Sequence, residues 1–268
     1  GTAGDTGSGM ALGVSAGGVA ERLTTATAWR FINPPVDFPK AALVNCKGER
    51  YIDETLYGAT IGTRMMEEHN GECILILDDT LFKSAVANLT LENARFVTWL
   101  QAKGALRMAK HANTLEELAQ RCKIDPAQLQ QTIAQYNRAA RGEIADPLGK
   151  KREDMHELKQ GPFHAINMSV GKGDITSVIT LGGLRVCEET GAVLNQHNKP
   201  VPGLFAAGRA AIGVASNAYV SGLSIADGVF SGRRAGRHAS LRATLPADST
   251  HAHSSGTMEE ARAAGCPV

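Results

Sequence analysis

The sequence has few aromatic residues and no excess of charge of either sign. Only 5% of its 268 residues are Phe, Trp or Tyr, and the formal net charge is +1. Surfaces that bind nucleic acid are usually basic and carry aromatic side chains on which bases stack. The composition therefore argues against nucleic acid as a partner, and the missing basic excess argues against an anionic membrane surface.

Long apolar runs and a signal-like start are also missing. No stretch approaches the roughly 18 consecutive apolar residues that a transmembrane helix needs. The first residues, GTAGDTGSG, contain neither the basic start nor the apolar core of a secretory signal. We therefore expect a protein without a membrane span, located in the cytoplasm.

The cysteines show no recognisable pairing. Their number is odd, none stands at CxxC spacing, and they are Cys46, Cys73, Cys122, Cys187 and Cys266. This favours free thiols over a disulfide framework. Cys266 shares a tail rich in Ala, Ser, Thr and His, residues 240–268, with His251 and His253. We expect that tail to be disordered and predict no metal site.

What the sequence does contain is the pattern of a mixed α/β protein. With 43% hydrophobic residues, it can form one large domain or two small ones. Short apolar segments at 41–45 and 73–77 predict strands. Residues 92–103 predict a helix that ends at Gly104.

Residues 114–140 predict two consecutive helices. Thr114 and Glu117 form a capping box ahead of the first helix. Asp125 is placed to cap the second. Apolar residues then recur on one helical face, at Leu129, Ile133 and Tyr136.

The C-terminal third indicates short strands, glycine turns and one long helix. Residues 177–186 predict a strand with a Gly–Gly break, and residues 202–207 predict a short buried strand. Ser221 then caps a long helix that runs from Gly222 to about His238.

Several motifs, in this order along the chain, resemble the fumarate reductase/3-ketosteroid dehydrogenase family of FAD-dependent flavoproteins. They are GDTGSGMALGVSAGG (4–18), KGERYIDETLYGATIG (47–62), two segments at 114–137 and 161–186, and PGLFAAGR with NAYVSGLSIADGVFSGRRAG (202–236). The resemblance covers about residues 1–238 and is nearest to 3-ketosteroid Δ4-(5α)-dehydrogenases. Ordered motifs of this kind are more specific than any one of them alone.

The resemblance implies an α/β fold: the C-terminal part of a Rossmann-like FAD-binding domain with an inserted α+β cap domain. Residues 1–35 and 166–239 would belong to the FAD-binding domain, and residues 36–165 to the cap. The family's GxGxxG fingerprint, which binds the ADP half of FAD, has no counterpart here, because the loop with Gly7 and Gly9 lacks the third glycine. We therefore expect a truncated chain or fragment that lacks much of the contact to pyrophosphate and adenosine.

A cofactor site is implied around the start of the last helix. The first N–H groups of a helix carry partial positive charge, which suits the negative charge of a reduced flavin. Gly222 and Leu223 are the expected donors. The full set of residues implied to bind FAD is Gly208, Arg209, Ser221, Gly222, Leu223 and Ser224.

The catalytic residues implied are Tyr219, Ser221 and Tyr57. Tyr219 and Ser221 resemble the Tyr-x-Ser-Gly arrangement of 3-ketosteroid Δ4-(5α)-dehydrogenases. In that chemistry flavin N5 takes a hydride from the CH–CH group beside a ketone, while a weak base takes the α-proton. Tyr219 would polarise the carbonyl or accept the proton, and Ser221 would relay it. Tyr57 would complete the group from the cap, or is simply a core or turn tyrosine.

The resemblance implies a bulky apolar ketone of the 3-ketosteroid type as the small-molecule substrate. The sequence does not identify the electron acceptor. Two alternatives stay open. A fumarate-reductase-like ene-reductase of an unsaturated acid needs cations for the carboxylates, yet residues 179–183 contain no His and residues 216–222 no Arg. An inactive remnant that packs against a partner is favoured by the missing fingerprint.

Overall fold

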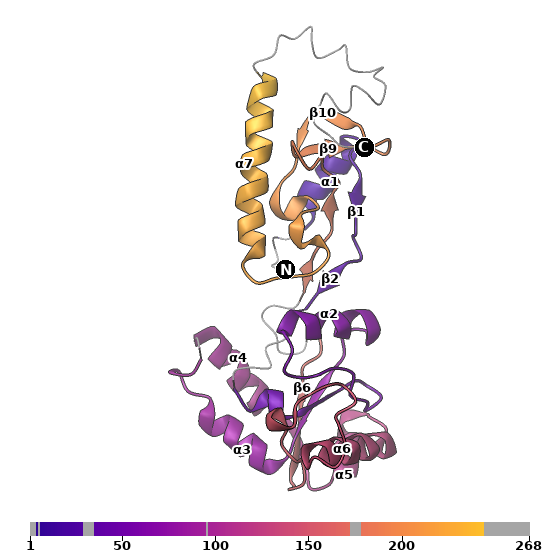
Figure 1. Ribbon diagram of the computed structural model, residues 1–268, viewed down its shortest axis with the longest axis vertical. Helices are drawn as coiled ribbons and strands as arrows, with labels where there is room; N and C mark the ends of the chain where they lie inside the picture. Colours follow the sequence, from indigo (N-terminus) through magenta and orange to yellow (C-terminus); the bar gives the residue numbers. More distant parts are fainter. Residues whose placement is uncertain (1–3, 5, 29–34, 95, 172–177, 244–268) are drawn as a thin grey trace. The chain divides into compact units, whose positions relative to one another are not determined.

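The computed structural model describes residues 4, 6–28, 35–94, 96–171 and 178–243, and divides the chain into two compact units (Figure 1). The central unit comprises residues 28–178. The discontinuous unit comprises residues 1–27 together with 179–268. These limits differ from the domain limits expected at 35 and 165, because the strand that contains residue 165 pairs within the central unit. The tail was predicted to begin at residue 240, which is wrong for residues 240–243, because they belong to a helix that runs from Leu223 to Ala243. The rest of the predicted tail, with His251, His253 and Cys266, lies outside the described residues.

The central unit is built on a four-stranded antiparallel sheet in the order β3-β4-β6-β5. Its strands are β3 (Ala42–Val44), β4 (Ile74–Leu77), β5 (Lys110–Ala112) and β6 (Phe163–Asn167). Its helices are α2 (Gly58–Glu68), α3 (Asp79–Asn88), α4 (Phe96–Arg107), α5 (Leu115–Cys122) and α6 (Pro126–Ala140). Short 3-10 turns lie at Phe38–Lys40 and Arg152–Asp154.

The predicted pair of helices at 114–140 is confirmed as α5 and α6. The Thr114 hydroxyl accepts from the Glu117 N–H at 3.2 Å, and the Asp125 carboxylate accepts from Ala127 and Gln128. Leu129, Ile133 and Tyr136 are all buried. In a capping box the Glu117 carboxylate would accept from the N–H of Thr114. Here it accepts instead from the N–H of Asn113, one residue earlier, at 3.3 Å.

Two expectations are wrong. Helix α4 continues through Gly104 to Arg107, so this glycine does not end it. Cys46, Cys73 and Cys122 are free thiols, whereas Cys187 is disulfide-bonded. When the number of cysteines is odd, at least one of them stays unpaired, but two of the others can still form a disulfide.

In its described residues the discontinuous unit contains three two-stranded antiparallel sheets, and isolated bridges link Leu184 to Ala211 and Val186 to Val193. They pair β1 (Ala20–Glu21) with β8 (Gly183–Leu184), β2 (Ala26–Thr27) with β7 (Ile179–Thr180), and β9 (Ala192–Leu194) with β10 (Pro200–Phe205). The predicted Gly–Gly break thus separates β7 from β8. Two helices accompany the strands, α1 (Ser8–Ser15) and α7 (Leu223–Ala243).

The hydrophobic core differs greatly between the units. In the central unit one continuous cluster extends from Ala28 to Ile166 and takes in all four strands. In the discontinuous unit the buried clusters are small, one made of Leu184, Val193, Ala206 and Ala211, and another of Cys187, Ala192 and Leu194. No helix in the described part of the chain is both long and apolar enough to cross a membrane.

Candidate functional site

The predicted cofactor loop follows β10 and leads into α7. Gly208 has a φ of +56° and opens a 3-10 turn, Gly208–Ala210, that turns the chain sharply after the strand. Its N–H donates to the Ser231 hydroxyl at 2.9 Å, which fixes the turn to the middle of α7. The Ser231 hydroxyl itself donates to the Asp227 carbonyl oxygen at 2.5 Å. The glycine turn is therefore positioned by the helix after it.

Arg209 reaches from this turn to strand β7. Its guanidinium donates to the backbone oxygen of Thr180 and, at 3.3 Å, to the Thr180 hydroxyl. A second link runs from the Ile212 N–H to the Leu184 oxygen at 2.9 Å, on strand β8. The loop is thus held between the two strands that flank the Gly–Gly break.

These contacts enclose a pocket within the discontinuous unit. It is lined by Thr180, Leu181, Gly182, Gly208, Arg209, Ala211, Gly213, Ala215, Ser216, Ser224 and Asp227. The lining combines glycine backbone, hydroxyl groups, one guanidinium and one carboxylate. Such a set suits the polar part of a nucleotide-like ligand, where a few hydrogen-bonding groups fix orientation.

Three of the residues predicted to bind the cofactor, Gly208, Arg209 and Ser224, meet in this pocket. Sequence reasoning missed Thr180, Gly213, Ser216 and Asp227. Asp227 lies one helical turn after Ser224, so its i, i+3 spacing on the predicted helix could have identified it.

The remaining predicted residues of this unit lie just before α7 or, in the case of Leu223, at its first position, and they are not part of the pocket lining. The helix begins at Leu223, one residue later than expected, and Ser221 and Gly222 form the turn before it. Gly222 has a φ of +85°, and a Cβ built on it would meet open space. The Leu223 N–H donates to the Val220 oxygen at 3.1 Å, so this proposed donor is engaged within the turn. Tyr219 is half-buried, and Ser221 is exposed.

Tyr57 belongs to the central unit. It is the residue before α2 and has an exposed fraction of 42%. It is therefore not a core tyrosine, but its place directly before the helix agrees with a turn tyrosine as well as with a catalytic one. Arg64, within α2, pairs with Glu68 at 3.0 Å on an exposed surface.

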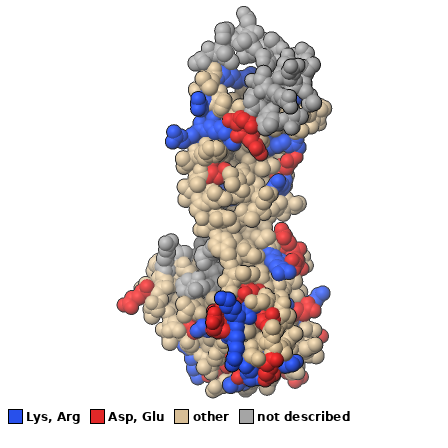
Figure 2. Space-filling view, viewed as in Figure 1, with Lys and Arg blue, Asp and Glu red and all other residues tan. Residues whose placement is uncertain are grey.

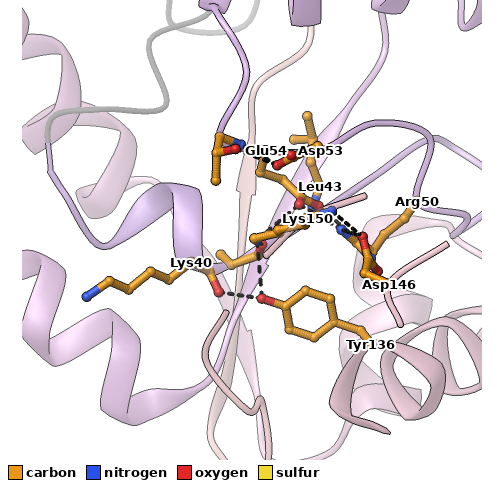
Figure 3. Close-up of polar contacts among 10 residues, drawn as sticks. Lys40, Leu43, Arg50, Asp53, Glu54, Tyr136, Asp146 and Lys150 are labelled. Atoms are coloured by element: carbon orange, nitrogen blue, oxygen red, sulfur yellow. Dashed lines mark hydrogen bonds and ion pairs between the residues drawn. The ribbon is translucent and has the colours of Figure 1, made fainter. Parts of the chain in front are cut away.

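The central unit also contains a buried cluster of charges that sequence reasoning did not find (Figure 3). Arg50 pairs with Glu54 at 2.8 Å and with Asp146 at 2.6 Å. Lys150 pairs with Glu54 at 3.0 Å, and neither of these two side chains has any solvent exposure. Two cations and two carboxylates thus balance one another away from water.

Hydrogen bonds complete this cluster. The Lys150 ammonium donates to the Ala41 oxygen at 2.9 Å and to the Tyr136 hydroxyl at 3.3 Å. The Glu54 carboxylate accepts from the N–H of Leu43 at 2.8 Å, in the middle of the edge strand β3. Burial lowers the pKa of Lys150, and the charge of Glu54 opposes this shift. Since every charged group is paired, the cluster holds the fold together rather than offering a reactive side chain.

Most of the chain matches a known family and known enzymes. The model of the FAD binding domain family matches residues 5–225. The chain is 39% identical over 210 residues to the 3-oxo-5-alpha-steroid 4-dehydrogenase of Comamonas testosteroni, covering 78% of this chain and 40% of that protein. It is 29% identical over 202 residues to the fumarate reductase of Schizosaccharomyces pombe, covering 75% of this chain and 36% of that protein.

A solved structure agrees. The 3-ketosteroid-delta4-(5alpha)-dehydrogenase from Rhodococcus jostii, in complex with 4-androstene-3,17-dione, matches with a TM-score of 0.69 and 31% identity. The match covers 87% of this chain and 45% of that one. The chain thus spans less than half the length of these relatives.

This protein belongs to the FAD-binding domain family, which confirms the resemblance described above and its cofactor, FAD. Its relatives include both ketosteroid dehydrogenases and fumarate reductases.

Proposed function

We propose that this chain provides the substrate side and part of the flavin site of an FAD-dependent oxidoreductase that dehydrogenates the CH–CH group beside a ketone. The discontinuous unit is the C-terminal part of a Rossmann-like FAD-binding domain, and the central unit is an inserted cap. The substrate is a bulky apolar ketone of the 3-ketosteroid type. The observation that carries the proposal is the polar pocket formed by the glycine turn at Gly208, in a chain 39% identical to a steroid dehydrogenase.

The residues of the pocket, and Gly222 in the turn before α7, fit FAD. Backbone at Gly208 and Gly222 is open to close approach, because both have positive φ and a Cβ on either would be 3.6 Å or more from its neighbours. Arg209 provides a cation for a phosphate or a polar chain, and Ser224 and Asp227 can bond hydroxyl groups. When bound, FAD supplies the hydride acceptor.

Residues of this chain bind the substrate and transfer the proton. Tyr219 would hold its hydroxyl against the ketone oxygen or accept the α-proton, and Ser221 would pass that proton on. Gly222 would direct its N–H toward the same region, together with Leu223 if the turn at Val220 opens. Tyr57 would contact the substrate from the cap.

Binding is tested by titrating the purified chain with FAD while flavin fluorescence is recorded. Arg209→Ala is expected to weaken binding by about tenfold, which corresponds to the loss of one charge-assisted hydrogen bond. Arg152→Ala, an exposed arginine of the central unit, is the matched control and should leave the affinity unchanged. Equal affinities for all three proteins would contradict the assignment of the pocket.

Catalysis is tested with a saturated 3-oxo-5-alpha-steroid and an artificial electron acceptor. Tyr219→Phe keeps the ring but removes the proton-transferring hydroxyl, so turnover should fall by about a hundredfold or more. FAD affinity should stay as it was, and Val220→Ala is the neighbouring control. Unchanged turnover in Tyr219→Phe would sink the proposed role. Reduction of fumarate without steroid turnover would favour the ene-reductase instead.

A further inference from the structure

Helix α4 of the central unit has apolar residues on two sides. Toward the core it buries Ala102 and Leu106, whose exposed fractions are 7% and 8%. On its other side Phe96 and Leu100 are exposed, with fractions of 65% and 48%. A surface helix normally turns one apolar stripe toward the core and polar residues toward water. The second apolar stripe therefore marks a surface that contacts something other than water.

Cations continue this second stripe toward the C-terminal end of the helix. Phe96, Leu100, Lys103 and Arg107 follow one another at spacings of four, three and four residues, which places them on one line along α4. Lys103 and Arg107 are exposed. The Lys103 ammonium lies 4.5 Å from the centroid of the Trp99 ring, and the Trp99 ring stacks beside Phe96 at 6.3 Å between centroids. We define Phe96, Trp99, Leu100, Lys103 and Arg107 as the outer face of α4.

The sequence around these cations contains no carboxylate. Between Phe96 and Leu115 there is no Asp or Glu, whereas Lys103, Arg107 and Lys110 contribute three positive charges. Elsewhere the two signs alternate, and Figure 2 shows Lys and Arg mixed with Asp and Glu over the visible face of the central unit. The net charge of +1 for the whole chain therefore conceals one locally basic segment.

The outer face of α4 combines the residue types of a helix that lies in the surface of a membrane. Such a helix places Trp, Phe and Leu at the boundary between headgroups and acyl chains. Its Lys and Arg side chains lay their apolar stems along that boundary and extend their charges to anionic headgroups. With 12 residues, α4 is shorter than the roughly 20 residues of a span, so this contact is one of lying on the bilayer.

We propose that the outer face of α4 binds to an anionic lipid surface. Such a surface offers an apolar layer for Phe96 and Leu100 and phosphate groups for Lys103 and Arg107. A second copy of the chain fits less well, because α4 packed on α4 supplies no carboxylate to pair the cations. A membrane is also where a bulky apolar ketone accumulates, and this last reason alone rests on the proposed function.

The test is flotation of the purified chain with lipid vesicles, in the absence of FAD and steroid. Vesicles of phosphatidylcholine and phosphatidylglycerol in equal amounts should retain the chain. Vesicles of phosphatidylcholine alone should bind it at least about tenfold more weakly, since each Lys or Arg near an anionic leaflet strengthens binding about fivefold. Because neither flavin nor substrate is present, a failure here is distinguishable from a failure of the proposed function.

Two variants separate the apolar and the charged parts of the face. Phe96→Glu should weaken binding to the anionic vesicles at least about tenfold, because it carries a charge into the apolar layer. Phe230→Glu is its matched control, since Phe230 in α7 is 61% exposed and receives the same charge. Lys103→Gln combined with Arg107→Gln should weaken binding about fivefold for each cation removed.

Controls for charge and folding accompany these variants. Lys151→Gln removes a cation of the same unit that is 76% exposed, and it should leave binding unchanged. Circular dichroism of each variant without vesicles should match that of the wild-type chain, because the substituted side chains are exposed.

Trp99 reports on the contact itself. The chain has two tryptophans, so Trp29→Phe leaves Trp99 as the single emitter. Its fluorescence should shift to shorter wavelength when anionic vesicles are added, since the indole ring moves from water to a less polar layer. An unchanged emission from chain that floats with the vesicles would mean that another surface makes the contact.

Three further results would overturn the proposal. One is failure of the wild-type chain to bind the anionic vesicles, or equal binding to both kinds of vesicle. Another is an equal loss of binding with Phe96→Glu and Phe230→Glu. The third is a dimer, seen by size-exclusion chromatography, that Phe96→Glu dissociates and anionic vesicles do not displace, because a second copy would then occupy the outer face of α4.

Discussion

The two units of this chain bury their side chains to very different extents. The central unit has a continuous core across a four-stranded sheet and a fully paired set of internal charges. The discontinuous unit has small clusters, two-stranded sheets and a last helix whose apolar residues face outward. The difference teaches that the larger core lies in the unit with the paired internal charges, whereas the predicted cofactor loop lies in the unit whose described residues form the smaller buried clusters.

The largest effect is expected from a substitution that breaks the internal charge pairing of the central unit. Lys150→Met removes one cation and leaves Glu54 and Asp146 with Arg50 alone. Removing one partner of a buried pair typically costs about 3–5 kcal/mol, so the free energy of unfolding measured in urea should fall by that amount. Lys151→Met is the control, because the Lys151 side chain is 76% exposed and should change stability by less than about 0.5 kcal/mol.

A double variant checks the cause of that loss. Lys150→Met combined with Glu54→Gln leaves Arg50 and Asp146 as one balanced pair, so part of the lost stability should return. A double variant as unstable as the sum of the two single variants would show that the charges act independently.

The next effect compares the same substitution in the two cores. Leu75→Ala, in the middle of β4, should cost about 3–5 kcal/mol, because tightly packed neighbours cannot close the cavity. Leu184→Ala, in the small cluster of the discontinuous unit, should cost about 2 kcal/mol, since fewer neighbours surround it and they can relax. Amide hydrogen exchange, which reports on each unit separately, is the measurement. Equal costs would mean that the difference between the cores has no energetic consequence.

The smallest effect is a pH dependence confined to the central unit. Burial lowers the pKa of His164, which stacks on Phe82 at 3.8 Å between ring centroids, and attraction to Asp79 opposes the shift. The unfolded state therefore binds the proton more readily, so stability is fully present above about pH 6.5 and falls as the pH drops below it. Burial lowers the pKa of His69 as well, so it adds to the same slope.

His164→Phe should flatten the dependence of stability on pH between about 5 and 7, measured by urea unfolding at several pH values. His197→Asn, an exposed histidine of the discontinuous unit, should leave the slope unchanged. If His164→Phe does not alter the dependence of stability on pH, a group other than His164 is responsible for it.

Local sequence patterns predicted the helices that are stabilised by contacts between neighbouring residues. Thr114 and Asp125 cap α5 and α6 because the hydrogen bonds involved span two or three residues. Glycine is less reliable: Gly104 was expected to end a helix, but α4 continues through it. The packing of the next residues in the chain decides where a helix ends, and a single glycine does not encode that packing.

Contacts between residues far apart in the sequence were not predicted. Glu54 meets Lys150 across 96 residues, and no spacing rule connects them. The same holds for the pocket, where Thr180 joins Arg209 and Asp227 only once β7 and α7 are in place. The predicted Gly208, Arg209 and Ser224 lie near one another in sequence, and their ordered motifs carried the family resemblance.

The buried charges of the central unit join segments of the chain that lie far apart in the sequence. Lys150 donates to the oxygen of Ala41, 109 residues earlier, and to Glu54, 96 residues earlier. Contacts of such long sequence separation are slow to form and tend to be made late in folding. Interactions that are absent from the transition state slow the unfolding rate and leave the folding rate almost unchanged. If these contacts form only after the transition state, loss of the cluster should raise the unfolding rate of the central unit more than it lowers its folding rate.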